Sequence, residues 1–200
     1  MEDVLFLPDS HQYFVGGVEL PSVTHICRFL SVDIADGAKP WMRDAAAQRG
    51  TIIHAACESI DYGLDPDGLT PETTPYTIAY LDFLRDYRIT GWAGIEVIMG
   101  SRQLGYAGTA DRIGWIDGKL VILDIKTGST LHTQPLAAQL TGYAKLYRFQ
   151  AGRFPDALYG LHLKKDGTYT LREVTINHDL WASCVYLNNA IAPKRRKKLD

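Results

Sequence analysis

The sequence predicts a single α/β domain, in which helices cover both faces of a central mixed β-sheet of about four to six strands. Three observations favour this fold class. Strand-like and helix-like patterns alternate along the chain. Residues 105–128 have the pattern of a β-hairpin whose second strand is apolar enough to lie inside a sheet. The chain has 200 residues, 46% of them hydrophobic, which is enough for one core. We therefore expect one domain over residues 1–193 and a basic, disordered tail over 194–200.

The N-terminal residues are expected to form a small unit of their own. Turn-forming residues separate three short strands over 4–7, 12–15 and 18–20. The segment Pro-Ser-Val-Thr that follows opens a short helix, and Ser22 is placed to cap its first turn.

Two helices and a strand are predicted between this unit and the hairpin. The helical pattern over 39–62 contains Gly50, where we expect a break. In the next helix, over 76–87, three apolar residues recur with helical spacing and should form the buried stripe: Ile78, Leu81 and Leu84. A strand over 92–99 follows.

The central hairpin turns at Asp117-Gly118, a pair that suits a type I′ turn because both positions tolerate positive φ. If this turn sets the register without a bulge, Asp111 lies directly opposite Asp124. Like charges that face each other destabilise a sheet, so the pair needs something to neutralise it, and a divalent cation is the simplest candidate. Lys126 shares a face with Asp124, because side chains in a strand alternate between faces. Charged residues on such an apolar strand favour a functional site over a solvated face.

The elements after the hairpin complete the alternating pattern. A helix over 133–149 puts Gln139 and Tyr143 on one face. A second hairpin turns around Asp166-Gly167, and its strands span 157–163 and 169–174. A helix over 180–191 closes the domain.

The composition excludes several classes of protein. No apolar run reaches the length of a membrane span, and the acidic N-terminus lacks the pattern of a secretory signal, so we expect a cytoplasmic protein without membrane contact. Three widely spaced cysteines indicate neither a disulfide framework nor a zinc site: Cys27, Cys57 and Cys184. The net charge is −2 although residues 194–198 are all basic, so binding of nucleic acid would depend on local basic patches.

Four segments resemble the PD-(D/E)XK nuclease superfamily, in its RecB-like and phage-exonuclease branch. They occur in the order of the family: RGTIIHAACE at 49–58, GTADRI at 108–113, LDIKTG at 123–128 and QLTGYA at 139–144. The resemblance implies a restriction-endonuclease-like fold and a metal-dependent DNA nuclease, most simply an exonuclease of phage or mobile-element recombination and repair. It also implies DNA as the partner, with a recombination or annealing protein as a further candidate. The location that it implies is the cytoplasm of a bacterium or of a phage-infected host cell.

The resemblance also implies a set of metal ligands, for which Mg²⁺ or Mn²⁺ is the expected ion. Asp111 and Asp124 would bind it through their carboxylates and Ile125 through its carbonyl. His54 matches the histidine that binds metal in this branch and would complete the set. Lys126 would orient the attacking water and stabilise charge that develops on the phosphate.

Roles for the other matched residues are less sharply defined by the sequence. Glu58 is either a partner of the site or a solvated charge on its helix, and Glu96 either reaches the site or forms an ion pair elsewhere. Gln139 and Tyr143 would contact the substrate backbone or brace Lys126. The remaining candidates, which would contact phosphate, are Arg49, Arg102 and Arg112.

Three alternatives to a DNA exonuclease remain open from the sequence. The same site could serve an endonuclease or an RNA-processing enzyme. A nuclease fold could also bind DNA or a protein partner without cleavage, although the complete set of Asp111, Asp124 and Lys126 argues against a decayed site. Strand polarity, the choice between single- and double-stranded substrate and the oligomeric state are likewise open.

Overall fold

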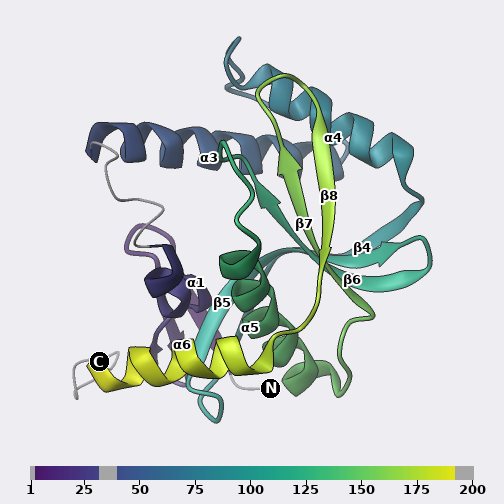
Figure 1. The fold of residues 1–200 in the computed structure, drawn as a ribbon. Helices are drawn as coiled ribbons and strands as arrows, with labels where there is room; N and C mark the ends of the chain where they lie inside the picture. Colours follow the sequence, from purple (N-terminus) through teal and green to yellow (C-terminus); the bar gives the residue numbers. More distant parts are fainter. Residues whose placement is uncertain (1–2, 32–39, 192–200) are drawn as a thin grey trace.

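The computed structural model describes residues 3–31 and 40–191, so the basic tail predicted at 194–200 lies outside the described residues. It shows a single α/β domain built on a five-stranded mixed sheet (Figure 1). Within the described ranges, no helix is both long enough and apolar enough to cross a membrane.

The central sheet has the strand order β4-β5-β6-β7-β8. The parallel pair is β6 with β7, and the other neighbours are antiparallel. The chain passes from β6 to β7 through α5, the crossover helix that a parallel pair requires. The five strands are β4 (Ile89–Ser101), β5 (Tyr106–Ile116), β6 (Lys119–Lys126), β7 (Ala157–Leu163) and β8 (Tyr169–Val174).

Helices cover both faces of the sheet, as predicted. On one face lie α5 (Thr133–Ala151), α6 (His178–Ile191) and the short α1 (Val23–Ile26), and on the other lie α3 (Pro40–Asp61) and α4 (Thr74–Asp86) (Figure 1). Strand β6 is apolar on both sides, because Ile122 packs into the core beneath α5 while Leu123 and Ile125 pack into the core beneath α3 and α4. The alternation of the strand therefore puts Asp124 on the α5 face.

A second, three-stranded antiparallel sheet stands at the N-terminus. It consists of β1 (Val4–Leu7), β2 (Gln12–Val15) and β3 (Val18–Leu20), with the predicted boundaries. Ser22 caps α1 as expected, since its hydroxyl accepts a hydrogen bond from the backbone N–H of His25 at 3.0 Å. Ala107 of β5 packs into the small core of this sheet and donates a backbone hydrogen bond to the Pro21 carbonyl. The N-terminal unit, followed by the 3₁₀ helix η1 (Cys27–Ser31), is thereby fixed to the central sheet.

Two predictions about helices were wrong. Helix α3 continues through Gly50 without a break, because a single glycine weakens a helix by only about 1 kcal/mol. In α4, Ile78 and Leu81 are 48% and 50% exposed, whereas Tyr80 and Phe83 are fully buried. Both faces of α4 carry apolar residues, so spacing alone could not identify the buried face.

Candidate functional site

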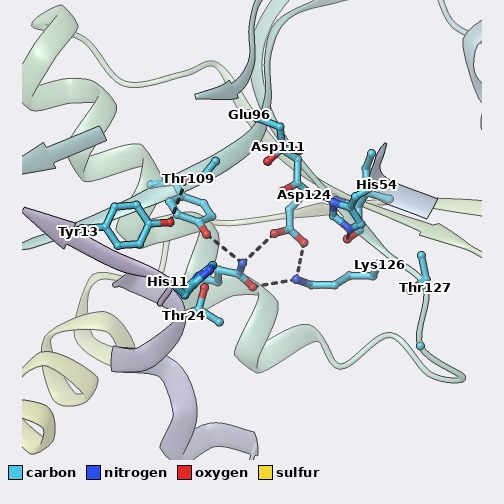
Figure 2. Close-up of a pocket in the computed structure, with 14 residues that line it drawn as sticks. His11, Tyr13, Thr24, His54, Glu96, Thr109, Asp111, Asp124, Lys126 and Thr127 are labelled. Carbon is cyan, nitrogen blue, oxygen red and sulfur yellow. Dashed lines mark hydrogen bonds and ion pairs between the residues drawn. The ribbon is translucent and has the colours of Figure 1, made fainter. Parts of the chain in front are cut away.

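A cavity of about 350 Å³ opens beside the carboxyl end of β6 (Figure 2). Its walls come from parts of the chain that are far apart in sequence: the N-terminal sheet, α3, the central strands β4 to β6, and α5. Among the residues that line it are His54, Asp111, Asp124 and Lys126. These four residues therefore share one cavity.

The central hairpin has the register that its turn predicts. Asp117 and Gly118 have φ values of 50° and 79°, as a type I′ turn requires, and Arg112 pairs with Leu123. One position further, Asp111 and Asp124 both line the cavity, so they lie on the same side of the sheet. The Asp111 carboxylate accepts a hydrogen bond of 2.6 Å from the backbone N–H of Ile125, which binds the two strands together at the site.

Asp124 and Lys126, which lie side by side in Figure 2, are joined by the amide of Gln139. The Lys126 ammonium lies 2.7 Å from one oxygen of Asp124 and donates a hydrogen bond of 3.0 Å to the Gln139 carbonyl oxygen. The Gln139 amide nitrogen donates to the other oxygen of Asp124 at 2.9 Å and to the Tyr143 hydroxyl at 3.2 Å. Both functional groups of Gln139 are thus engaged within the site, and this arrangement favours bracing of Lys126 over contact with substrate.

Burial and charge shift the pKa values of this pair in a consistent way. The pKa of Asp124 is raised to about 6. Burial is the main cause, Lys126 opposes it, and the charge of the neighbouring Asp111 adds to it. For Lys126, burial alone would lower the pKa, but the charges of Asp124 and Asp111 outweigh it and raise the pKa. Lys126 therefore remains a cation, with three donors and no lone pair to offer a metal.

His54 reaches the site from α3. Its Nε2 donates to the Ile125 carbonyl at 3.1 Å, and its Nδ1 lies 3.7 Å from Asp111 Oδ2. Two neighbouring ligands of an octahedral ion, each about 2.1 Å from it, are separated by about 3.0 Å. The spacing of Nε2 and the Ile125 oxygen therefore also matches two ligands of one ion.

Glu96 is the residue whose part in the site could not be decided from the sequence. The neighbouring pairs Ile95–Arg112 and Val97–Ala110 place it opposite Asp111 on the adjacent strand. Together with the register of the hairpin, this puts Glu96, Asp111 and Asp124 side by side across β4, β5 and β6. Each of His54, Glu96 and Asp111 offers one ligand atom within 4.8 Å of the others. Carboxylates and an imidazole grouped in this way fit a divalent cation.

The backbone and the carboxyl group of Glu96 are both in unfavourable states. Its φ is 48°, a region that residues with a Cβ rarely occupy. Burial, together with the charge of Asp111, raises the pKa of Glu96 to about 7 against the opposing effects of His54 and Arg112. Strain and an unfavourable charge on one residue are characteristic of functional sites.

We expect Glu96→Gln to raise the melting temperature of the metal-free protein by a few degrees above pH 7. Because the pKa of Glu96 is raised from an ordinary 4.5 to about 7, ionisation destabilises the folded state as the pH rises through this range. The neutral amide removes that effect, so the two proteins should have similar melting temperatures below pH 4.5. Thermal unfolding in chelator across this pH range tests the prediction, with Asp67→Asn, which changes an exposed loop carboxylate, as the control. A melting temperature at or below that of the unmodified protein above pH 7 would contradict it.

Three residues predicted at the site lie elsewhere. Arg112 is fully buried, and its guanidinium pairs with Asp61 and Glu96, so the expected contact with phosphate is wrong. Arg49 lines a second cavity next to the first. Glu58 is half-buried one turn beyond His54 and is not among the described residues that line the first cavity.

The N-terminal sheet, with its turn at His11, and helix α1 supply residues that sequence reasoning missed. His11, Tyr13 and Thr24 line the cavity, and the Tyr13 hydroxyl is hydrogen-bonded to Thr109 of β5 at 2.8 Å. The sequence around Thr24 belongs to the predicted N-cap segment, but nothing in its local pattern indicated a contact with the hairpin. Only the packing of the two sheets brings these residues to the site.

Comparisons with known proteins give little further guidance. No model of a known protein family matches the sequence. No curated protein matches it either. Among solved structures, the fold is similar to a crystal structure from Eubacterium rectale described as a "Putative exonuclease". The two share 12% sequence identity and a TM-score of 0.47, over 76% of this chain and 70% of the other.

Proposed function

We propose that the protein is a metal-dependent nuclease of the PD-(D/E)XK type that hydrolyses phosphodiester bonds in DNA. The observation that carries this proposal is the row of three carboxylates, Glu96, Asp111 and Asp124, with Lys126 beside it in one cavity. Carboxylates alone would indicate only a cation site. The added ammonium, held by Asp124 and Gln139, supplies a positive charge where a phosphate would lie.

The residues that would hold the cation come from four elements. Asp111 and Asp124 offer carboxylates from the hairpin, Glu96 offers one from β4, and His54 offers an imidazole from α3, with the Ile125 carbonyl at its side. A bound Mg²⁺ or Mn²⁺ supplies the charge neutralisation and the acidity of water that phosphodiester hydrolysis needs at neutral pH. The imidazole favours Mn²⁺ more than Mg²⁺.

Lys126 contributes the electrostatic part of the mechanism. Its ammonium is braced by the Gln139 carbonyl oxygen at 3.0 Å and by Asp124 at 2.7 Å, so its position is set before substrate arrives. A donor that is held in place stabilises negative charge on the phosphate without reorganisation. Its third hydrogen remains available to a phosphate oxygen or to the attacking water.

The finer assignment rests on the resemblance of the four sequence segments. An exonuclease that degrades linear DNA in phage or mobile-element recombination is the activity that this resemblance implies. An exonuclease requires an end, whereas an endonuclease of the same chemistry does not, so the form of the DNA distinguishes the two.

We expect linear DNA to be degraded only when Mg²⁺ or Mn²⁺ is present, and EDTA to abolish the reaction, because hydrolysis at neutral pH needs the charge neutralisation and the acidity of water that the cation supplies. The measurements are release of nucleotides from end-labelled linear duplex and single-stranded DNA, and loss of the covalently closed form of a circular duplex.

Asp124→Asn, purified in the same way, is the control for contaminating nucleases. Cleavage at full rate in EDTA would refute the dependence on metal. Binding of DNA without cleavage under every metal condition would refute the nuclease and leave a binding module.

A further inference from the structure

A second cavity of about 390 Å³ adjoins the first. The two cavities share Thr127 and Gly128, which begin the loop after β6. His162 of β7 holds this loop, since its Nε2 donates a hydrogen bond of 2.7 Å to the Gly128 carbonyl. The loop therefore forms a fixed boundary between the two adjoining cavities.

The parallel pairing of β6 and β7 decides which residues gather there. Lys126 pairs with His162, so the carboxyl ends of the two strands lie at the same edge of the sheet. Lys164 and Lys165 follow directly after β7 and line the second cavity. Crevices outside the carboxyl ends of parallel strands are the usual ligand sites of open α/β sheets.

The turn that carries the two lysines is well ordered by its own hydrogen bonds. The backbone N–H of Lys164 donates to the Thr168 carbonyl at 2.9 Å. The Asp166 carboxylate accepts from the backbone N–H and the hydroxyl of Thr168, at 3.0 and 2.7 Å. The acidic residue of the turn is thus used to build the turn, and within residues 3–31 and 40–191 neither lysine is held in an ion pair.

Arg49 adds a third positive charge from α3. One terminal nitrogen lies 3.3 Å from the exposed carboxylate of Glu72. Its Nε is buried and, among the described residues, has no hydrogen-bond partner. An exposed ion pair of this kind contributes little free energy, so a stronger anion can replace Glu72 at small cost.

We propose that this second cavity binds backbone phosphates of the same nucleic-acid strand whose scissile phosphate lies at Lys126. The inference rests on the proposed function and adds the direction in which the strand leaves the site, over the 127–128 loop toward Lys164 and Lys165. A chain with a net charge of −2 needs such a local patch, because most of its surface does not attract a polyanion. Two cavities in series match a polymer with regularly spaced phosphates better than a single small anion.

The test compares the double variant Lys164→Gln, Lys165→Gln with Lys119→Gln. Lys119 is an exposed lysine and the first residue of β6, at the end of the strand opposite to the two cavities, and therefore serves as the control. Binding of a fluorescein-labelled single-stranded oligonucleotide is measured by anisotropy in EDTA, over a series of NaCl concentrations, so cleavage does not interfere. Each phosphate contact on a single strand contributes about 0.7 to the slope of log K against log salt concentration. We expect the slope of the double variant to be shallower by about 1.4, and that of Lys119→Gln to be unchanged.

An unchanged slope in a double variant of unchanged melting temperature would overturn the inference. That result, with metal-dependent cleavage intact, would leave the proposed nuclease in place. If the slope is shallower but the unmodified protein cleaves no DNA with either metal, the phosphate site is supported and the proposed nuclease function is refuted. A shallower slope together with a raised KM and an unchanged kcat on linear DNA would support both.

Discussion

Replacing Lys126 with alanine is expected to lower the rate of DNA cleavage by about 100-fold or more while the protein still binds Mn²⁺. Lys126 shares a face with Asp124 and lies 2.7 Å from it, but a protonated amine cannot coordinate a metal. Removing the ammonium also removes a repulsion, so the affinity for Mn²⁺ should be equal or slightly higher. Calorimetric titration with Mn²⁺ and cleavage rates on the same preparations measure the two properties separately.

The companion variant Asp124→Ala should lose both properties, because it removes an anionic oxygen ligand. The titrations should be carried out about two pH units above the pKa of Asp124, so that protons do not compete with Mn²⁺ for its carboxylate. Lys119→Ala, on the same strand but outside the cavity, is the control. If Lys126→Ala cuts DNA at the unmodified rate, the role given to Lys126 is wrong. Loss of Mn²⁺ binding in Lys126→Ala would show instead that its effect is structural.

Asp61→Ala should reduce the free energy of unfolding by about 3–5 kcal/mol, because it removes the buried partner of the Arg112 charge and leaves only the half-buried Glu96 beside it. The side chains of Asp61 and Arg112 are 1% and 0% exposed. The Asp61 carboxylate also accepts hydrogen bonds from the Tyr80 hydroxyl at 2.7 Å and from the Trp92 indole at 2.9 Å. Urea denaturation in chelator measures the loss.

The exposed ion pair of Asp82 with Arg85 provides the comparison for this variant. Its side chains are 36% and 70% exposed, so Asp82→Ala should cost less than about 1 kcal/mol. Asp61→Asn keeps the size of the side chain and one acceptor oxygen. Its loss of unfolding free energy should therefore lie between those of Asp61→Ala and Asp82→Ala. An Asp61→Ala variant as stable as Asp82→Ala would show that the pair of Asp61 and Arg112 does not hold the domain together.

This buried pair also connects the fold to the site. Asp61 ends α3, the helix that carries His54, while Arg112 follows Asp111 on β5 and donates to its carbonyl oxygen at 2.7 Å. The same guanidinium lies 3.3 Å from Glu96 of β4. Three elements that supply ligands are therefore tied to one cation, and this explains why Arg112 is buried rather than exposed to substrate.

The sequence by itself determined the central hairpin and the residues that depend on it. The turn at Asp117-Gly118 sets the register locally, and the period of two then decides which side chains share a face with Asp124. Asp111, Asp124 and Lys126 could be brought together on these grounds because the hairpin is a local structure.

Only the tertiary structure decided the rest of the site. Glu96 and the N-terminal sheet join it through contacts between segments far apart in the chain, which no local pattern encodes. His54 was expected at the site only from the resemblance of its segment to a nuclease family, and its contact with the hairpin is likewise tertiary. The backbone of Glu96 opposes local preference with a φ of 48°, which the surrounding sheet imposes. Arg112 looked like a phosphate ligand because its sequence neighbours are site residues, but alternation turns it to the opposite face, where Asp61 holds it. Local chemistry sets the register of a hairpin, whereas packing between distant elements decides which charges are buried and which face the cavity.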